Sequence, residues 1–276
     1  MVDACGSHEA LAARLRATGS VFAEDEATLL LQHAAAAPCS PDELETLVAR
    51  RCAGEPLELV VGWASFGGVR VTVAPGVFVP RQRTTLLVGL AEGVLRDEPR
   101  GAAPVVVDLC CGTGAVGAAL LARLPGLDLH AADLDPDAVA CARRNLPADR
   151  VHQGDLLEAL PTALRGRVDV VVANAPYVPT DAIGTMPPEA REHEHHVALD
   201  GGDDGLAVHR RIAQTVRPWL AAGGVVLIET SVRQAPATAA LLHAVGLATR
   251  VVHDEDVDGT VVVAHVPTEP ERRATV

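Results

Sequence analysis

The tetrapeptide Asn174-Ala175-Pro176-Tyr177 directly follows the apolar run 168–173. An Asn that ends a buried strand before Pro and an aromatic residue presents an amide oxygen, a backbone carbonyl and a flat ring. The side-chain oxygen of Asn174 and the carbonyl of residue 175 can accept both hydrogens of an NH₂ group, with Tyr177 as a wall. Such positioning supplies up to ~7 to 11 kcal/mol of a barrier, so the set suits an amino group held for alkylation. The alternative is that Asn-x-Pro-Tyr is an ordinary turn, since Asn and Pro are common turn residues.

A second candidate site is a glycine-rich turn after the apolar strand 105–109. Glycines let the backbone come close to a nucleotide, and the amides at the start of the following helix, expected over 118–124, point at it. Residues 112–117 form Gly-x-Gly-x-x-Gly, and an acidic residue follows about 20 residues later, as in dinucleotide-binding enzymes. This match alone also fits an NAD-dependent dehydrogenase.

Acidic residues end the next two predicted strands. Asp133 is placed to accept from the hydroxyls of a ribose, and Asp155 from the exocyclic amine of an adenine. Each acid taken alone could equally be a helix N-cap or a solvated loop residue. Open α/β sheets bind ligands at the carboxyl ends of their strands, so we expect one site that contains Gly112, Asp133, Asp155 and Asn174.

Strands and helices alternate from residue 105 onward, which predicts an α/β fold with a mostly parallel sheet. Helices are expected over 84–95, 136–145, 206–220 and 235–244, and a strand over 225–229. The last two strands, 247–253 and 260–265, have no helix between them and therefore predict an antiparallel hairpin at the edge of the sheet.

The N-terminal part predicts a separate helical unit. Three short helices are expected over 7–18, 24–37 and 41–52, the last with a Ser cap and a first-turn Pro. A hairpin over 59–63 and 66–73, turning near Ala64 and Ser65, is expected to connect it to the core. We therefore expect a helical domain with a hairpin linker over residues 1–75 and a catalytic domain over 76–276.

Together these motifs resemble class I S-adenosylmethionine-dependent methyltransferases, and most closely the glutamine methyltransferases that modify peptide-chain release factors. The family's Asp-Leu-Gly-Thr-Gly-x-Gly loop and Asn-Pro-Pro-Tyr correspond to residues 108–114 and 174–177. Pro-Arg-x-x-Thr at 80–84 and Ala-Leu-Asp-Gly-Gly at 198–202 are more specific signals than the glycine loop. The likeness covers roughly residues 25–267.

The resemblance implies a Rossmann-like, seven-stranded, mostly parallel sheet with an antiparallel edge hairpin and a small N-terminal helical domain that grips the substrate protein. It also implies methyl transfer to a glutamine side-chain amide, in the GGQ motif of a release factor, by residues 174–177. Cofactor contacts are implied for Cys110, Cys111, Gly112, Thr113, Gly114, Asp133, Asp155, Leu156 and Asn174.

Several residues depart from the family pattern. Ala175 replaces the first Pro of Asn-Pro-Pro-Tyr, which keeps the carbonyl but loosens the loop. Cys110 and Cys111 replace Gly and Thr, and Cys110 is tolerable only if its backbone does not need a positive φ. Thr85 stands where the family has Glu, and His195 where it has Pro. These changes affect the identity of the substrate more than the type of reaction.

The composition separates the alternatives in part. A net charge of −13 argues against duplex binding, although an adenine-amine nucleic-acid methyltransferase would use a similar loop. A small-molecule methyltransferase and a non-catalytic cofactor-binding module also remain open. No apolar run approaches the ~18 residues of a membrane helix and no signal peptide is evident, so we expect a cytoplasmic protein.

Cysteine and histidine usage predicts no metal site and no disulfide framework. The six Cys include no Cys-x-x-Cys pair, so free thiols are expected. His193, His195 and His196 alternate with Glu192 and Glu194 in a polar loop, which we interpret as solvated surface.

Overall fold

The computed structural model describes residues 7–36, 40–97 and 103–267. Its centre is a seven-stranded sheet in the order β5-β4-β3-β6-β7-β9-β8. Neighbouring strands from β5 to β7 are parallel, whereas β9 pairs antiparallel with both β7 and β8. The predicted fold class and its edge hairpin are therefore confirmed. The strands are β3 Val105–Leu109, β4 Asp128–Asp133, β5 Val151–Gln153, β6 Val168–Ala173, β7 Leu220–Glu229, β8 Ala248–Asp254 and β9 Gly259–His265.

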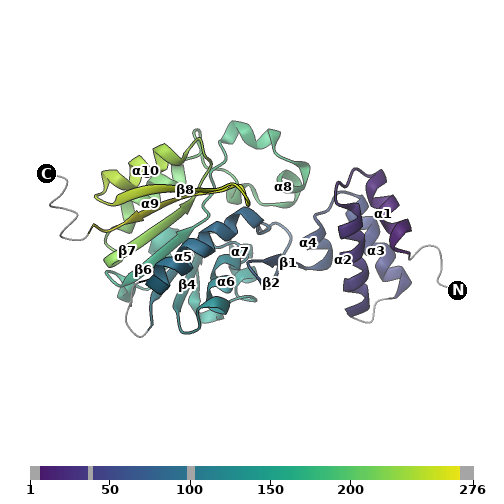
Figure 1. Cartoon of the computed structure of the whole chain (residues 1–276), viewed down its shortest axis with the longest axis horizontal. Coiled ribbons are helices and arrows are strands. Elements are labelled where there is room, and N and C mark those ends of the chain that lie inside the picture. The colour runs from purple at the N-terminus through teal and green to yellow at the C-terminus, as the bar shows by residue number, and fades with distance from the viewer. Residues whose placement is uncertain (1–6, 37–39, 98–102, 268–276) are drawn as a thin grey trace.

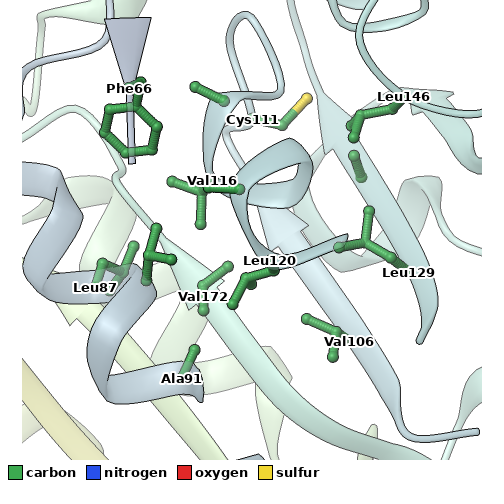
Figure 2. Close-up of a cluster of buried hydrophobic side chains, with 14 of the residues drawn as sticks. Phe66, Leu87, Ala91, Val106, Cys111, Val116, Leu120, Leu129, Leu146 and Val172 are labelled. Atoms are coloured by element: carbon green, nitrogen blue, oxygen red, sulfur yellow. The ribbon is translucent and has the colours of Figure 1, made fainter. Parts of the chain in front are cut away.

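Both faces of this sheet are apolar because helices cover both (Figure 1). Alternate residues of a strand point to opposite faces, so Val106 packs in one cluster and Val107 in the other. Figure 2 shows the first cluster, in which Val106 and Val172 of the sheet lie near Leu120. The covering helices are α5 Thr85–Asp97, α6 Ala115–Arg123 and α7 Pro136–Ala142 on this face, and α9 Ala207–Val216 and α10 Ala235–Ala244 on the other.

The N-terminal helices form their own unit, which lies beside the sheet and not over it (Figure 1). They are α1 His8–Ala17, α2 Ala23–Ala36 and α3 Pro41–Cys52, close to the predicted ranges; predicted position 37 lies outside the described residues. Leu11, Leu15 and Leu30 are buried in a cluster of this unit. Arg51 of α3 pairs at 2.8 Å with Glu189 of α8 Pro188–His193, so the unit contacts the segment that follows the Asn174 loop.

The predicted linker hairpin was wrong in its boundaries. Residues 57–61 form a helix, α4 Leu57–Val61, which ends at Gly62 with φ +79°. The hairpin is β1 Trp63–Phe66 and β2 Val69–Thr72, and it turns at Gly67 and Gly68. These glycines have φ +57° and +91°, and two positive φ values are what the commonest two-residue hairpin turn requires.

Other boundaries differ by a few residues. The helix expected over 206–220 ends at Val216, before Pro218, and β7 starts at Leu220. Within the described ranges no helix is long and apolar enough to cross a membrane.

Candidate active site

A pocket opens at the carboxyl ends of β3, β4 and β6, where the sequence predicted one. Every predicted site residue lines it except Gly114. Gly114 has φ +75° and is the N-cap of α6, and a Cβ there would lie 2.8 Å from Leu146 Cδ1. The predicted residues in the lining are Cys110, Cys111, Gly112, Thr113, Asp133, Asp155, Leu156, Asn174, Ala175, Pro176 and Tyr177.

The glycine-rich loop after β3, residues 110–114, turns sharply at one side of this pocket. Gly112 has φ +54°, and a Cβ there would meet nothing closer than 4.0 Å, so the backbone faces open space. Cys110 also has φ +54°, which contradicts the condition under which its replacement of Gly was tolerable. The tight exit from β3 imposes this left-handed backbone on a residue with a Cβ, at a cost of about 1 to 3 kcal/mol.

Neither thiol of the loop is activated. Burial raises the pKa of both Cys110 and Cys111 well above the usual range, and nearby carboxylates raise it further. Cys111 lies among the apolar side chains of the first cluster, with Val116 and Leu146 (Figure 2). The thiols therefore serve as small apolar lining and not as nucleophiles.

Asp133 has acceptor capacity left for a ligand. Its Oδ2 accepts from the amide of Gly112 at 2.8 Å and its Oδ1 from the amide of Asp135 at 3.0 Å. A carboxylate has about four acceptor positions, so about two are available for a pair of ribose hydroxyls. Burial raises the pKa of Asp133, and donors to the carboxylate oppose that rise. The residues present thus fit an adenosyl group.

Asp108 is a second buried acid in the lining, to which the sequence analysis assigned no role. Burial raises its pKa to about 8, although its Oδ2 accepts from the amide of Gly117 at 3.0 Å. The available signal was a carboxylate near the end of the otherwise apolar strand Val105–Leu109.

On the predicted adenine side of the pocket, one carboxylate oxygen already has a partner within the protein. Asp155 Oδ2 pairs with Arg211 of α9, and both residues line the pocket. Leu156 has φ +50° and starts a short 3-10 helix, Leu156–Ala159. The contacts assigned to these two residues stay predictions.

The two predicted amide acceptors are both available. Asn174 Nδ2 donates to Thr84 Oγ1 at 3.3 Å, which turns the amide oxygen away from Thr84. Within the described residues neither Asn174 Oδ1 nor the Ala175 carbonyl accepts a hydrogen bond, and both residues line the pocket. The loop therefore presents two oxygens to an incoming donor pair.

Tyr177 is held from behind. Its hydroxyl donates to Glu229 Oε1 at 3.4 Å, and burial raises the pKa of Tyr177 to about 12. Its backbone carbonyl accepts from Gln234 Nε2 at 2.9 Å, and a Cβ at Gly205 would lie 2.3 Å from that carbonyl. This contact gives Gly205 a physical reason. Neither Glu229 nor Gln234 was predicted as a site residue.

The interpretation of the His and Glu cluster as solvated surface was wrong for two residues. The side chain of Glu194 is buried, accepts from the amide of Val79 at 3.1 Å and pairs with Arg81 at 2.5 Å. His195 Nδ1 lies 2.6 Å from Asp135 Oδ2. These contacts attach the segment after α8 to residues 79–81, which precede α5, and to Asp135, the N-cap of α7. They form because the backbone of this segment pairs with Gly76, a long-range contact that a polar composition does not reveal.

Comparisons with known proteins agree with this geometry. Residues 69–186 match the methyltransferase small domain family. A release factor glutamine methyltransferase of Streptomyces coelicolor is 43% identical over 185 residues, which cover 66% of this chain and 65% of that protein. A release factor glutamine methyltransferase of Deinococcus radiodurans is 34% identical over 248 residues, which cover 85% of this chain and 88% of that protein.

Two further likenesses bear on substrate and fold. A 4-amino-L-phenylalanine/4-methylamino-L-phenylalanine methyltransferase of Streptomyces pristinaespiralis is 36% identical over 250 residues, covering 83% of this chain and 84% of that protein. A solved methyltransferase structure from Pyrococcus furiosus, 15% identical, superposes with a TM-score of 0.51 and covers 73% of this chain and 90% of that one. This structural likeness shows the fold alone.

Proposed function

The chain belongs to the release factor glutamine methyltransferase family, and from that premise we propose that it methylates the side-chain amide nitrogen of a glutamine in a protein. The family uses S-adenosylmethionine, which supplies an activated methyl group on a sulfonium. The partner we propose is a class 1 peptide-chain release factor with its GGQ motif, and the place of action is the cytoplasm.

The observation that carries the proposal is the pair of unengaged oxygens at Asn174 and Ala175. An amide nitrogen is a weak nucleophile because its lone pair is delocalised. Two acceptors that take both of its hydrogens fix the nitrogen and direct its electron density away from the loop. Neither acceptor is a base, so the nitrogen loses its proton to solvent after it has gained the methyl group.

Other residues that line the pocket can be assigned to the separate parts of the cofactor. We propose that Asp133 binds the ribose, that Asp155 and Leu156 flank the adenine, and that the loop from Cys110 to Thr113 accommodates the methionine portion. The spare acceptor positions of Asp133 and the open face of Gly112 support this placement.

The N-terminal unit and the α8 segment are placed to hold a protein substrate. Met186, Val197 and Leu199 of the segment after the Asn174 loop line the pocket. Arg51 joins this segment to the N-terminal helices through Glu189. We therefore propose that residues 1–75 bind the substrate protein while residues 76–276 carry the cofactor.

An aryl amine of a free amino acid is the second candidate substrate, and Arg83 favours it. Arg83 lines the pocket beside Thr84, its side chain is 45% exposed, and its described ion pair runs from Nε to Glu229 at 3.7 Å. The two terminal amino groups of the guanidinium are thus able to bind a carboxylate bidentately. A glutamine within a protein chain carries no such carboxylate.

Isotope-labelled cofactor distinguishes the candidates. The purified chain is incubated with a class 1 release factor, with the same factor carrying Gln→Ala at its GGQ motif, and with 4-amino-L-phenylalanine, and products are mapped by mass spectrometry. The proposal expects label on the glutamine and none in the Gln→Ala factor. Label on the aryl amine alone would favour the second candidate, and label on neither would refute both.

A further inference from the structure

Gln234 contacts the acceptor loop, residues 174–177, from outside the pocket. It is the N-cap of α10, but its side chain does not cap that helix, and it is not among the residues that line the pocket. Its Nε2 donates to the carbonyl of Tyr177 at 2.9 Å and to the carbonyl of Asp204 at 3.1 Å. Its Oε1 accepts from the hydroxyl of Ser231 at 2.6 Å. The reaction described above assigns no role to this residue.

The partners of the Gln234 amide fix its orientation. Two backbone carbonyls only accept, so the NH₂ end must face them, and it uses both of its hydrogens there. The hydroxyl oxygen of Ser231 accepts from the backbone amide of Gln234 at 3.2 Å, so its own hydrogen remains for Gln234 Oε1. An amide turned by half a rotation would set its oxygen against two carbonyl oxygens. The side chain is therefore held in one orientation.

The backbone of the acceptor loop has few other contacts. Among the described residues, the hydrogen bond from Gln234 is the one that reaches the main chain of residues 174–177. Pro176 has no N–H to donate, and its ring fixes one of the torsions between the carbonyls of Ala175 and Tyr177. A hydrogen bond that holds the Tyr177 carbonyl therefore also limits the directions open to the Ala175 carbonyl.

Gly205 shows how closely three segments approach at this hydrogen bond. A Cβ on Gly205 would lie 2.3 Å from both Gln234 Nε2 and the carbonyl oxygen of Tyr177, and Gly205 has φ +74°. Only a residue without a side chain fits there. The loop after β6, the segment after Asp200 and the start of α10 therefore meet at the Gln234 amide.

We infer that Gln234 is a positioning residue for methyl transfer: by holding the Tyr177 carbonyl it fixes the acceptor loop, and with it the Ala175 carbonyl and the Tyr177 ring. The inference rests on the proposed function, because it concerns how the acceptor pair of that reaction is kept in place. It also gives the loop a constraint from outside, where Ala175 lacks the ring of a proline.

Three variants and a matched control test the inference in the full chain. Gln234→Met removes all three side-chain hydrogen bonds at similar length, Gln234→Glu keeps the contact with Ser231 but loses both donors, and Ser231→Ala removes only the hydroxyl that orients the amide. Asn145→Ala is the control, since Asn145 also makes three side-chain hydrogen bonds, each at 2.8 Å, and none of them reaches the acceptor loop. Turnover, KM for the methyl acceptor, affinity for S-adenosylhomocysteine and Tm are measured for each.

Tyr177 provides a direct readout of the hydrogen bond, because it is the one tyrosine in the chain. When the carbonyl carbon of tyrosine is isotopically labelled, the protein gives a single carbonyl signal in the NMR spectrum, and that signal belongs to Tyr177. A hydrogen bond to a carbonyl moves its carbon signal to higher frequency. Gln234→Met should therefore move the signal to lower frequency, and Asn145→Ala should leave it in place.

We expect Gln234→Met and Gln234→Glu to lower kcat by about 10- to 100-fold, because misplaced acceptors no longer aim the nitrogen, while KM and cofactor affinity stay within about threefold of the parent. Ser231→Ala should lose less, since both donors of Gln234 remain. The double variant Gln234→Met with Ser231→Ala should lose little more than Gln234→Met alone. Asn145→Ala should lower Tm at least as much as Gln234→Met but leave kcat within about threefold of the parent.

Two outcomes would overturn the inference. One is a loss of kcat in Gln234→Met no larger than that in Asn145→Ala at a similar loss of Tm. The other is a Tyr177 carbonyl signal that does not move in Gln234→Met. Should Gln234→Met fail to fold, Gln234→Glu takes its place in both comparisons.

Activity of the parent on the release factor tests the proposed function separately. Should the parent methylate no acceptor, the proposed function fails, and the NMR signal of Tyr177 decides whether Gln234 holds the loop. A signal that moves to lower frequency in Gln234→Met and stays in place in Asn145→Ala supports that hold, and an equal signal in both variants contradicts it.

Discussion

Removal of the Asn174 side chain should separate catalysis from cofactor binding. In the structure Asn174 makes one described side-chain hydrogen bond within the protein, to Thr84 at 3.3 Å, and its Oδ1 is one of the two oxygens of the 174–175 loop that accept no hydrogen bond from the described residues. Asn174→Ala deletes that acceptor but leaves the Ala175 carbonyl and Asp133, the proposed ribose-binding acid, in place.

The size of the loss follows from these contacts. One preorganised polar contact to a reacting group contributes about 2.7 to 4 kcal/mol, so turnover should fall about 100- to 1000-fold. Loss of the single hydrogen bond to Thr84 costs only about 1 kcal/mol of folding stability. Cofactor affinity should stay within about tenfold, because Asp133 and the glycine loop are untouched.

Single-turnover methyl transfer at saturating cofactor, with calorimetry of S-adenosylhomocysteine binding, measures both quantities. Asn145→Ala is the matched control. Asn145 makes three hydrogen bonds, to the amide and carbonyl of Thr72 and the carbonyl of Thr113, each at 2.8 Å. Its removal should lower Tm more than Asn174→Ala does, yet leave the methyl-transfer rate within about threefold.

Equal single-turnover rates for Asn174→Ala and the parent would refute the role of the Asn174 oxygen. A loss of cofactor binding as large as the loss of rate would show instead that Asn174 holds the cofactor and not the acceptor nitrogen.

Three further outcomes follow from the same pocket. Asp133→Asn should weaken S-adenosylhomocysteine binding at neutral pH, as measured by titration calorimetry. Because burial raises the pKa of Asp133 and only the charged form accepts from both ribose hydroxyls, the parent should lose affinity as pH falls, and the variant should not. Cys110→Gly should raise the free energy of unfolding in urea by about 1 kcal/mol, because it relieves a left-handed φ of +54°. Asp108→Asn should flatten the dependence of the free energy of unfolding on pH. The folded-state pKa of Asp108, about 8, lies above its ordinary value of 3.8, so the parent loses stability as pH rises between these two values. An unchanged slope in the variant would contradict the raised pKa of Asp108.

The central strands and the site loops could be predicted from the sequence because each rests on a local pattern. Runs such as 105–109 and 168–173 are apolar on both faces of a parallel sheet, and the polar residues that end them must meet at one edge. The position of the pocket therefore follows from the order and direction of the strands, and it can be predicted before any side-chain contact is known.

The misses come from contacts that only the folded chain makes. Glu194 and His195 belong to a polar segment, and only the pairing of this segment with Gly76 in the folded chain buries Glu194 and brings His195 to Asp135. Glu229 ends a strand without any motif, so its hydrogen bond with Tyr177 had no local signal. The hairpin boundaries failed for a local reason, since Gly67-Gly68 marks a two-residue turn that the apolar pattern around 59–63 obscured.

A crystal structure of the chain with S-adenosylhomocysteine and a glutamine-bearing release factor tests the central claim most directly. The account predicts that the glutamine amide nitrogen lies about 2.7 to 3.2 Å from both Asn174 Oδ1 and the Ala175 carbonyl, beside the Tyr177 ring. A glutamine bound elsewhere, or an amide nitrogen that contacts neither oxygen, would contradict it.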